Sequence, residues 1–549
     1  MYLCRFNAKF YKLSRENTLS KIIIIGKKMS LIDKNVAFYS LIAAFGGFVF
    51  GLDAANISGA IRFISSEFEL TSSQTGTVAG IALIGVICAL FITGPLCERF
   101  GRKKVLLAIA LAYSVSTILS STAVSYEMLV IGRFIGGVAF ASITVSAMYI
   151  GEIAPADKRG KFVSTNQLMI AVGLLLAFVI NYFLIKMMGD ISWINNDNIW
   201  RYMLGAELIA NVIWVTLIFF IPESPRWLIM KGRNEEAKTI LAKISLAYQI
   251  EPTITEVTAS INLDKKNSIL NQLKDLFSTR MRFVLVLAVV YAVVQGATGM
   301  NAVLFFAPLV FEQVGMSVQD TFMQTIVMGL VGVISTIFAI AFVEKLGRRF
   351  LTLGGLLLVV VAHGSTWFGF SQVTYEFDQS VMMKIEKQFT QENYDIERLK
   401  PLVGKVFKSD VDLKVQLAEI FNKKELPLVS GIVINASIQG VNAGMVLFGI
   451  FAFLAAFNLS IGPILWVIFS EIFPNNVRSV ALPFAALVQT IASWSVSEFF
   501  PWQLEHLGVS NIFLIYGCIG LFGLVLMFFI LPETKGKTIE AIEKELVTA

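Results

Sequence analysis

Long apolar runs recur along the chain, and short polar stretches separate them. Each run is about 20 residues long, the length that an α-helix needs to cross a hydrocarbon core of roughly 30 Å. The runs are continuous and do not alternate apolar with polar residues, so they favour helices over a transmembrane β-barrel. They lie at 37–57, 77–97, 104–124, 128–149, 163–185, 202–221, 282–311, 323–343, 350–371, 441–468, 479–500 and 510–531. The pattern therefore predicts a membrane protein with twelve transmembrane helices.

Composition and charge agree with this prediction. Of the 549 residues, 56% are hydrophobic and 15% are charged, and the mean hydropathy is +0.71. The net charge of +6 could indicate nucleic-acid binding, but Lys and Arg gather at the N-terminus and in every second loop, for example at 99–104, 158–161 and 345–349. Cytoplasmic loops of membrane proteins carry such an excess of Lys and Arg. Both termini are therefore predicted to be cytoplasmic, and no nucleic-acid partner is expected.

Cysteines and histidines give no sign of a metal site or of catalysis. The four cysteines, Cys4, Cys88, Cys97 and Cys518, have no metal-ligand spacing, and three of them lie in or next to predicted spans, where they are expected to be packing residues. The chain has only two histidines, and neither belongs to a paired catalytic set. We therefore expect no cofactor, no metal and no enzymatic activity.

Three motifs occur twice, which indicates that two six-helix halves repeat one plan. GRKK at 101–104 is echoed by GRR at 347–349, GEIAPADKRG at 151–160 by SEIFPNNVRS at 470–479, and PESPRWL at 222–228 by PETKG at 532–536.

The second half carries an insertion. Gly101 and Glu152 are 51 residues apart, whereas Gly347 and Glu471 are 124 apart, and most of the excess falls at about 372–440. This charged stretch is predicted to form a small helical cap on the extracytoplasmic side. A solvated spacer and a gating or partner-binding element both remain open as its role.

These observations divide the chain into five parts. We predict a cytoplasmic N-terminal tail at 1–36, a six-helix bundle at 37–221, an intracellular helical linker at 222–281, a second six-helix bundle with the insertion at 282–531, and a cytoplasmic C-terminal tail at 532–549. Met29, which follows a basic stretch, offers an alternative start within the first part.

The motifs, taken in order, resemble those of the sugar porter family of the major facilitator superfamily. They are GRK at 101–103, RFIGG at 133–137, E-x-x-P-x-x-x-R-G at 152–160, PESPRWL, QGATGMN at 295–301, GPILWVIFSEIFP at 462–474 and PETKG. The resemblance covers about 35–540 apart from the insertion, and 149–227 looks most like bacterial proton-coupled symporters of the D-xylose type. It implies an all-α fold with two pseudo-symmetric six-helix bundles.

The resemblance also implies a sugar site between the halves, near the midplane. Amide side chains suit sugar hydroxyls, and aromatic rings suit the apolar face of a sugar. The positions that match the family are Phe50, Gln167, Gln295, Asn301, Trp466 and Gln489, and Phe305 replaces a usual Tyr. Further departures occur at Gly296, Gly332 and Thr490. They predict a larger pocket with fewer hydrogen-bonding groups, and hence a monosaccharide or polyol other than D-xylose.

Asp53 lies within an apolar, glycine-rich run, at a depth where a carboxylate is costly unless it is paired or hydrated. Arg133 on the fourth predicted helix is its expected partner, and Glu207 on the sixth is a second candidate acid. In the family, proton symporters carry an Asp at this place in the first helix, whereas facilitative members commonly carry a neutral residue. The three residues are therefore expected to couple sugar transport to protons, and a static helix-to-helix ion pair is the alternative.

Acids and bases also gather at the predicted cytoplasmic ends of the helices. The expected gate residues are Glu98, Arg102, Glu152, Arg159, Glu223, Arg226, Glu344, Arg348, Glu471 and Arg478. They could form interhelix pairs that hold the cytoplasmic face shut while the outside is open, or act only as anchors and surface pairs.

The sequence thus predicts a secondary transporter that imports a hexose, pentose or related polyol with protons by alternating access. A facilitative uniporter is the first alternative, and a transporter-like sugar sensor is the second. The expected partners are the sugar, protons and the lipid bilayer. A monomer in the plasma membrane, of the bacterial inner-membrane type, is the expected form.

Overall fold

The computed structural model describes residues 2–155, 158–188, 190–264, 269–392, 395–422, 425–474, 476–537 and 539–547. Twelve segments of this described chain are long and apolar enough to cross a membrane, which confirms the predicted number. They are the part of α1 (Tyr2–Glu67) from Ile32, α2 (Ser72–Phe100), α3 (Arg102–Ser121), α4 with α5 (Tyr126–Ala139, Ser142–Ile153), α6 (Arg159–Met187), α7 with α8 (Ile199–Gly205, Glu207–Ile218), η1 with α13 and α14 (Thr279–Met281, Arg282–Ala297, Met300–Phe305), α16 (Val318–Leu346), α17 (Arg348–Ser371), α21 with α22 (Ala443–Leu459, Ile461–Ile472), α23 (Arg478–His506) and α24 (Gly508–Ile530).

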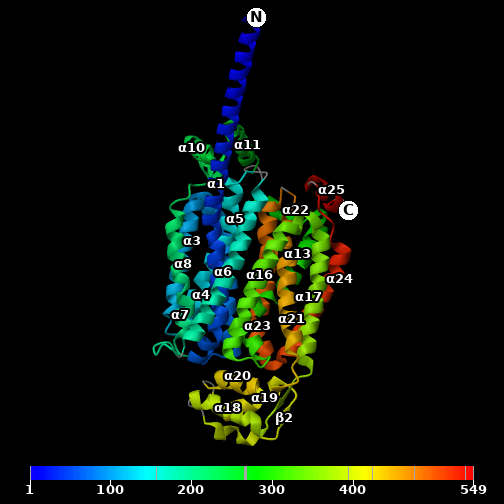
Figure 1. The fold of residues 1–549 in the computed structure, drawn as a ribbon. Coiled ribbons are helices and arrows are strands. Elements are labelled where there is room, and N and C mark those ends of the chain that lie inside the picture. The colour runs from blue at the N-terminus through cyan, green and yellow to red at the C-terminus, as the bar shows by residue number, and fades with distance from the viewer. Residues whose placement is uncertain are drawn as a thin grey trace.

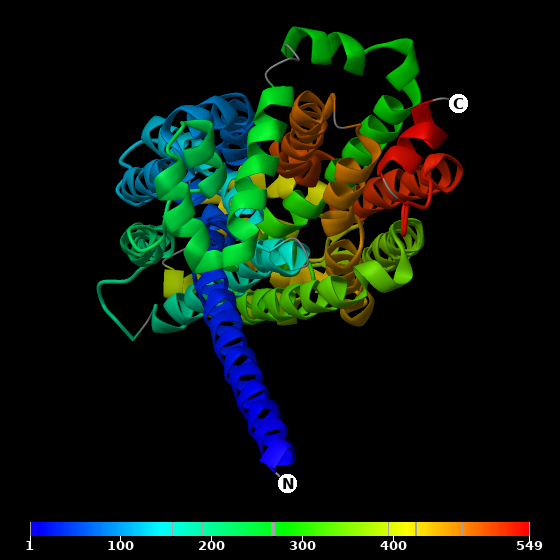
Figure 2. The ribbon, with the colours of Figure 1, turned by 90° about the horizontal axis from the view of Figure 1, so that it is seen from above.

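The membrane helices form two halves that lie side by side, α1–α8 in one and α13–α17 with α21–α24 in the other (Figure 2). Within the halves, α1 packs along α6, and α17 packs along α21 and α24. Two seams join the halves, one between α2 and α23 and one between α6 and α16. Small residues allow the close approach that such seams need. At Gly76 on α2, a Cβ atom would overlap the backbone carbonyl of Glu498 on α23.

Both chain ends lie on one side of the bundle, together with the linker helices (Figure 1). We call it the termini side. The elements there are α9 (Pro225–Met230), α10 (Asn234–Ile244), α11 (Ala247–Asp264), α12 (Ile269–Leu276) and α25 (Ile539–Val547).

The insertion lies on the opposite side, which we call the insertion side (Figure 1). It contains β1 (Thr374–Glu376), α18 (Gln379–Glu392), η2 (Ile396–Leu402), β2 (Val406–Phe407), α19 (Asp410–Ile420), α20 (Leu426–Ser437) and β3 (Ile438–Gln439). The strands form an antiparallel sheet in the order β2-β1-β3. Helices are what the composition predicts, but the sheet was not predicted, because strands of two or three residues leave no alternating pattern.

Local sequence explains where several helices begin on the insertion side. Thr71, Ser125 and Ser317 precede α2, α4 and α16, and each side chain accepts a hydrogen bond from a backbone N–H three residues later. Such caps satisfy donors that the first turn of a helix leaves free.

Candidate functional site

Asp53 on α1 and Arg133 on α4 form a buried ion pair between Oδ1 and Nη1. Their exposed fractions are 4% and 1%. Among the described residues, Asp53 Oδ2 and Arg133 Nε and Nη2 have no hydrogen-bond partner. A buried pair whose remaining polar atoms are unsatisfied is held less firmly than a fully bonded one. The structure thus brings the two predicted residues together in an arrangement that a proton could alter.

Glu207 begins α8 in the same half, and it is buried. Its Oε1 accepts hydrogen bonds from Thr117 Oγ1 and Asn211 Nδ2, both at 3.2 Å. Asn211 also donates to Thr117, at 3.0 Å. The acid therefore sits in a network of neutral partners, and Thr117 and Asn211 are members of this network that the sequence did not reveal.

Gln295, near the end of α13, meets Gln489 on α23. Gln489 Nε2 donates to Gln295 Oε1 at 2.9 Å and to Ser493 Oγ at 2.9 Å. Gln295 is buried and Gln489 is half-buried. Two predicted sugar ligands, 194 residues apart in sequence, are thus in direct contact.

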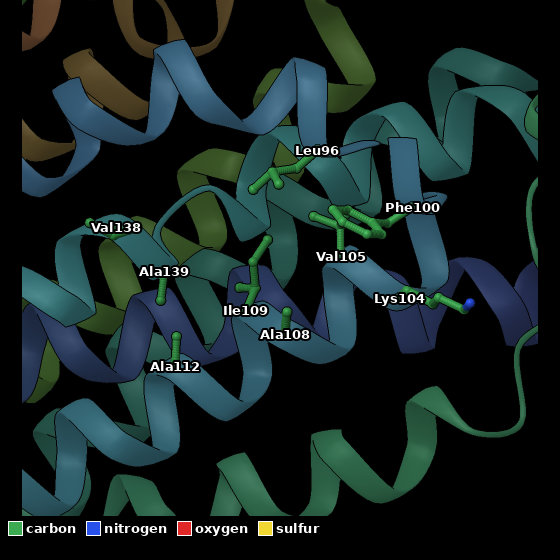
Figure 3. A pocket seen from close by; sticks show the side chains of 9 residues that line it. All are labelled: Leu96, Phe100, Lys104, Val105, Ala108, Ile109, Ala112, Val138 and Ala139. Atoms are coloured by element: carbon green, nitrogen blue, oxygen red, sulfur yellow. The ribbon is translucent and has the colours of Figure 1, made fainter. Parts of the chain in front are cut away.

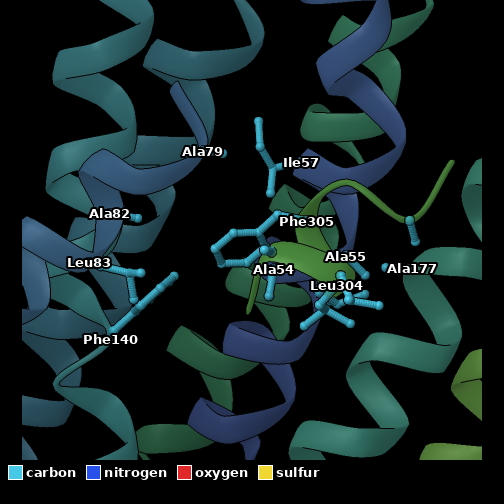
Figure 4. Packing of buried hydrophobic residues seen from close by; sticks show 14 of the residues in the cluster. Ala54, Ala55, Ile57, Ala79, Ala82, Leu83, Phe140, Ala177, Leu304 and Phe305 are labelled. Carbon is cyan, nitrogen blue, oxygen red and sulfur yellow. The ribbon is translucent and has the colours of Figure 1, made fainter. Parts of the chain in front are cut away.

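The predicted aromatic residues Phe50 on α1 and Phe305 on α14 have different surroundings. Phe50 packs edge to face on Phe140, with 4.5 Å between ring centroids. Phe305 is buried, and Figure 4 shows it among small apolar residues of α1 that include Ala54 and Ala55. Because α1 and α14 belong to different halves, Phe305 lies where the halves meet, whereas the ring contact of Phe50 is within its own half.

The three remaining predicted sugar ligands are less buried than Gln295. Gln167 on α6 and Asn301 on α14 are half-buried, and Trp466 on α22 is 48% exposed and packs edge to face on Phe469. In the part of the chain that the structure describes, no hydrogen bond joins these three residues to Gln295 or Gln489. The geometry therefore brings only part of the predicted set together.

A break between α13 and α14 lies next to the predicted amide positions. Gly299 has a φ of +91°, a conformation that side chains other than glycine rarely adopt. The carbonyl of the preceding Thr298 lies 3.0 Å from His363 Nε2, so the histidine fastens the break to α17. This contact could not be predicted from the sequence, since an isolated histidine in an apolar run is usually a packing residue.

Gly299→Ala is expected to lower the melting temperature of the purified protein. The added Cβ would lie 2.5 Å from the ring of Tyr516, and the backbone conformation costs on the order of 1–2 kcal/mol for an L-residue. Gly364→Ala is the matched control, because its Cβ would meet nothing within 4 Å on helix α17. An unchanged melting temperature for Gly299→Ala in a thermal unfolding assay would show that the break is not strained.

The first ionic cluster on the termini side lies within the N-terminal half. Arg102 Nη2 contacts Glu152 Oε1 at 2.7 Å, and Ser224 Oγ donates to Glu152 Oε2 at 2.5 Å. Glu223 Oε1 accepts hydrogen bonds from the backbone N–H groups of Arg102 and Lys103, at 2.8 and 3.1 Å. An acid is stabilised at this position because the N-terminus of α3 carries a partial positive charge.

The second cluster repeats this geometry in the other half. Arg348 Nη2 contacts Glu471 Oε1 at 2.9 Å, and the backbone N–H groups of Arg348 and Arg349 donate to Glu533, at 3.0 and 3.2 Å. Partial burial raises the pKa of Glu533, but hydrogen bonds from backbone amides, including that of Lys535, outweigh this effect and hold the pKa below its ordinary value. PESPRWL and PETKG thus each carry an acid, Glu223 or Glu533, that caps the N-terminus of the corresponding helix in its half, α3 or α17.

Each cluster joins helices within one half, so neither Arg102–Glu152 nor Arg348–Glu471 bridges the two halves here. The expected interhelix pairs therefore form here between helices of the same half.

The other predicted gate residues have separate surroundings. Glu98 is exposed, makes no ion pair with a described residue, and accepts a hydrogen bond from the Trp227 indole at its backbone carbonyl. Arg478 donates to the Phe473 carbonyl at 2.9 Å. Arg226 is exposed, and the side chains of Arg159 and Glu344 lie outside the described part.

An apolar groove of about 410 Å³ lies on the outer surface of α2, α3 and α4 (Figure 3). Leu96, Phe100, Lys104, Val105, Ala108, Ile109, Ala112, Val138 and Ala139 line it. None of the predicted sugar ligands is among them, and Lys104 is the only charged residue. The groove is therefore distinct from the candidate sugar site.

A family described as "Sugar (and other) transporter" matches residues 39–383 and 427–546. The chain belongs to this sugar transporter family. It is accordingly an integral membrane transporter and not an enzyme, and its fold is that of the major facilitator superfamily. The family match omits residues 384–426, which form most of the insertion.

Known sugar transporters resemble this chain over nearly its whole length. The D-xylose-proton symporter of Escherichia coli strain K12 is 31% identical, with 92% of this chain and 94% of that protein covered. The arabinose-proton symporter of Bacillus subtilis strain 168 is 29% identical, with 93% and 94% covered. Among solved structures, the proton:xylose symporter XylE bound to 6-bromo-6-deoxy-D-glucose has a TM-score of 0.70 and 29% identity, with 94% of this chain and 99% of that chain covered.

Proposed function

We propose that this sugar transporter imports a monosaccharide together with protons by alternating access. The observation that carries the proposal is the buried Asp53–Arg133 ion pair, because ionisable residues at membrane depth are costly and typically mark ion or substrate pathways. The relatives that are named as xylose- and arabinose-proton symporters support the same function.

Protonation of Asp53 is the proposed coupling step. The ionised carboxylate holds Arg133, and so ties α1 to α4. A proton neutralises the carboxylate, which weakens the pair and leaves the helices free to move relative to each other. Glu207 belongs to the same half and shares the proton path in this proposal, with Thr117 and Asn211 to stabilise its charge.

Gln295 and Gln489 are the proposed centre of the sugar site. These contacts leave Gln295 Nε2 as a donor and Gln489 Oε1 as an acceptor for sugar hydroxyls, which both donate and accept. Gln167 and Asn301 complete the polar surface, and Phe50, Phe305 and Trp466 supply apolar contact.

The departures from the family pattern do not all enlarge this site. At Gly296, a Cβ atom would lie 2.8 Å from the Gln489 carbonyl oxygen, so the glycine lets α13 approach α23 closely. Thr490 is buried and donates to the Ala486 carbonyl at 2.8 Å. The proposed substrate remains a monosaccharide or polyol other than D-xylose, because fewer side chains offer hydrogen bonds.

The termini side is proposed to face the cytoplasm of a bacterial plasma membrane. This orientation follows from the excess of Lys and Arg in the loops and helices on that side. The linker at 222–281 and the tails at 1–36 and 532–549 are then cytoplasmic. One copy of the chain supplies both halves of the proposed pathway, so a monomer in the lipid bilayer is sufficient.

Counterflow exchange in proteoliposomes tests the sugar site. We expect Gln295→Ala and Gln489→Ala each to raise the half-saturating sugar concentration about tenfold, because one or two hydrogen bonds to the sugar, worth about 1 kcal/mol each, are lost. The assay covers a panel of hexoses, pentoses and inositols, so it also identifies the substrate. Gln319→Ala, at an exposed position of α16, is the matched control. Tight, selective exchange of D-xylose would contradict the proposed substrate class.

A further inference from the structure

Three hydrogen bonds join described residues of the two halves across the insertion side. Arg62 Nη1 contacts Glu312 Oε1 at 2.6 Å, and Thr77 Oγ1 donates to Glu498 Oε1 at 2.6 Å. The third runs from the Ser72 hydroxyl to the carboxylate of Glu505. In each of them the N-terminal half provides the donor and the C-terminal half provides a carboxylate. The insertion side of the molecule is therefore held closed by polar contacts.

Arg62–Glu312 is the ion pair among these three contacts. Its side chains are only 10% and 8% exposed, so water screens their attraction weakly. Both of its groups are charged, whereas each of the other two contacts joins a neutral hydroxyl to a carboxylate. The pair is thus expected to contribute most to closure.

Glu312 ends α15 (Ala307–Glu312), which follows α14 in a segment bounded by two unusual glycines. Gly299 has a φ of +91° and Gly315 a φ of +84°. Each glycine permits a backbone conformation that strains other residues. The segment between them contacts α1 and carries one partner of the ion pair, so it is built as a short, separately hinged element.

Helix α20 of the insertion covers the ion pair. It contacts both α1 and α15. A Cβ atom on Gly431 would lie 3.3 Å from Glu312 Oε2 and 3.6 Å from Arg62 Nη2, so this helix passes close over both charged groups. Because an ion pair is stronger when protein replaces the water around it, α20 is placed to strengthen this one.

The insertion is also fastened to the end of the hinged segment. The side-chain amide of Asn435 on α20 donates to the backbone carbonyl of Met316. A Cβ atom on Gly315 would lie 2.7 Å from Ile438, the first residue of β3. Motion of the segment away from α1 would therefore have to break these contacts as well.

We propose that Arg62 and Glu312 form an ionic latch on the insertion side, and that α20 is a strap that stabilises the latch. Opening this side to sugar requires the pair to separate and α20 to lift from it. The proposal assigns the insertion a gating role, and it rests on the proposed alternating access.

The distance between spin labels at Val124 and Gln319 tests this proposal. Both positions are exposed on the insertion side, and they belong to different halves. The labels are placed in the full chain, with its four native cysteines replaced, and read by double electron–electron resonance without sugar. We expect Arg62→Gln and Gly431→Trp each to raise the ratio of long to short distances about tenfold, because each disturbs the buried pair.

Charge exchange and a distant control keep the test specific. The double variant Arg62→Glu/Glu312→Arg is expected to return the distances towards those of the parent protein. Arg280→Gln, which breaks the exposed Arg280–Glu543 pair, should leave them unchanged. Unchanged distances in correctly folded Arg62→Gln and Gly431→Trp variants would overturn the proposal. Since the measurement needs neither sugar nor a proton gradient, its outcome is independent of whether transport is proton-coupled.

Discussion

Asp53→Asn is expected to abolish sugar accumulation driven by a pH gradient, while sugar exchange between the two sides of the membrane persists. The amide has nearly the shape of the protonated acid, but it cannot release a proton or hold Arg133 as an ion. A symporter that moves one proton with each sugar accumulates sugar about tenfold per pH unit, since each tenfold ratio is about 1.4 kcal/mol. The variant should show no accumulation at any gradient, as measured by uptake of labelled sugar into proteoliposomes.

Asp33→Asn is the matched control for this experiment. Asp33 also lies on α1, but its ion pair with Lys158 is exposed, with 40% and 43% of the side chains accessible. Exposed pairs contribute little, so accumulation should remain near that of the parent protein. Accumulation by Asp53→Asn equal to that of this control would mean that the buried pair only cements α1 to α4.

Replacement of the arginines in the two termini-side clusters is expected to have the second large effect, a loss of folding stability. Arg102→Ala should lower the free energy of unfolding by about 3–5 kcal/mol, because it leaves the carboxylate of Glu152 largely buried and without its cation. Arg348→Ala should have a comparable effect through Glu471, since the second half repeats the geometry. The measurement is a thermal or denaturant unfolding curve of the purified protein.

Glu98→Gln provides the control for the clusters. Its carboxylate is exposed and makes no ion pair with a described residue, so stability should change by less than about 0.5 kcal/mol. If Arg102→Ala and Arg348→Ala were no more destabilising than Glu98→Gln, the clusters would be surface pairs, and their proposed role in fastening each half would be wrong.

The sequence predicted the membrane spans because length and hydrophobicity alone decide whether a helix can cross a bilayer. It also predicted the Asp53–Arg133 contact, since a membrane-buried acid needs a partner and few bases occur at that depth. The contact between Gln295 and Gln489 could be expected only from the resemblance to the sugar porter family. Nothing in the local sequence relates two amides 194 residues apart.

Other features could not be predicted, for physical reasons. Arg62 and Glu312 each lie near a helix end, where a charged residue usually meets water, and only the arrangement of the two halves buries them together. The contact of His363 with the break at Thr298 depends on the rotation of α17 about its axis. The same limit explains why the sequence could not say which of the termini-side acids and bases pair with each other.

We infer that protons move with the sugar. The most direct test records the external pH while sugar is added to lightly buffered proteoliposomes that contain the parent protein in its native orientation. Coupled import predicts alkalinisation of the external medium for a transported sugar, with no change for a sugar that is not exchanged. Transport of sugar without any pH change would contradict the claim and would identify the protein as a facilitative uniporter.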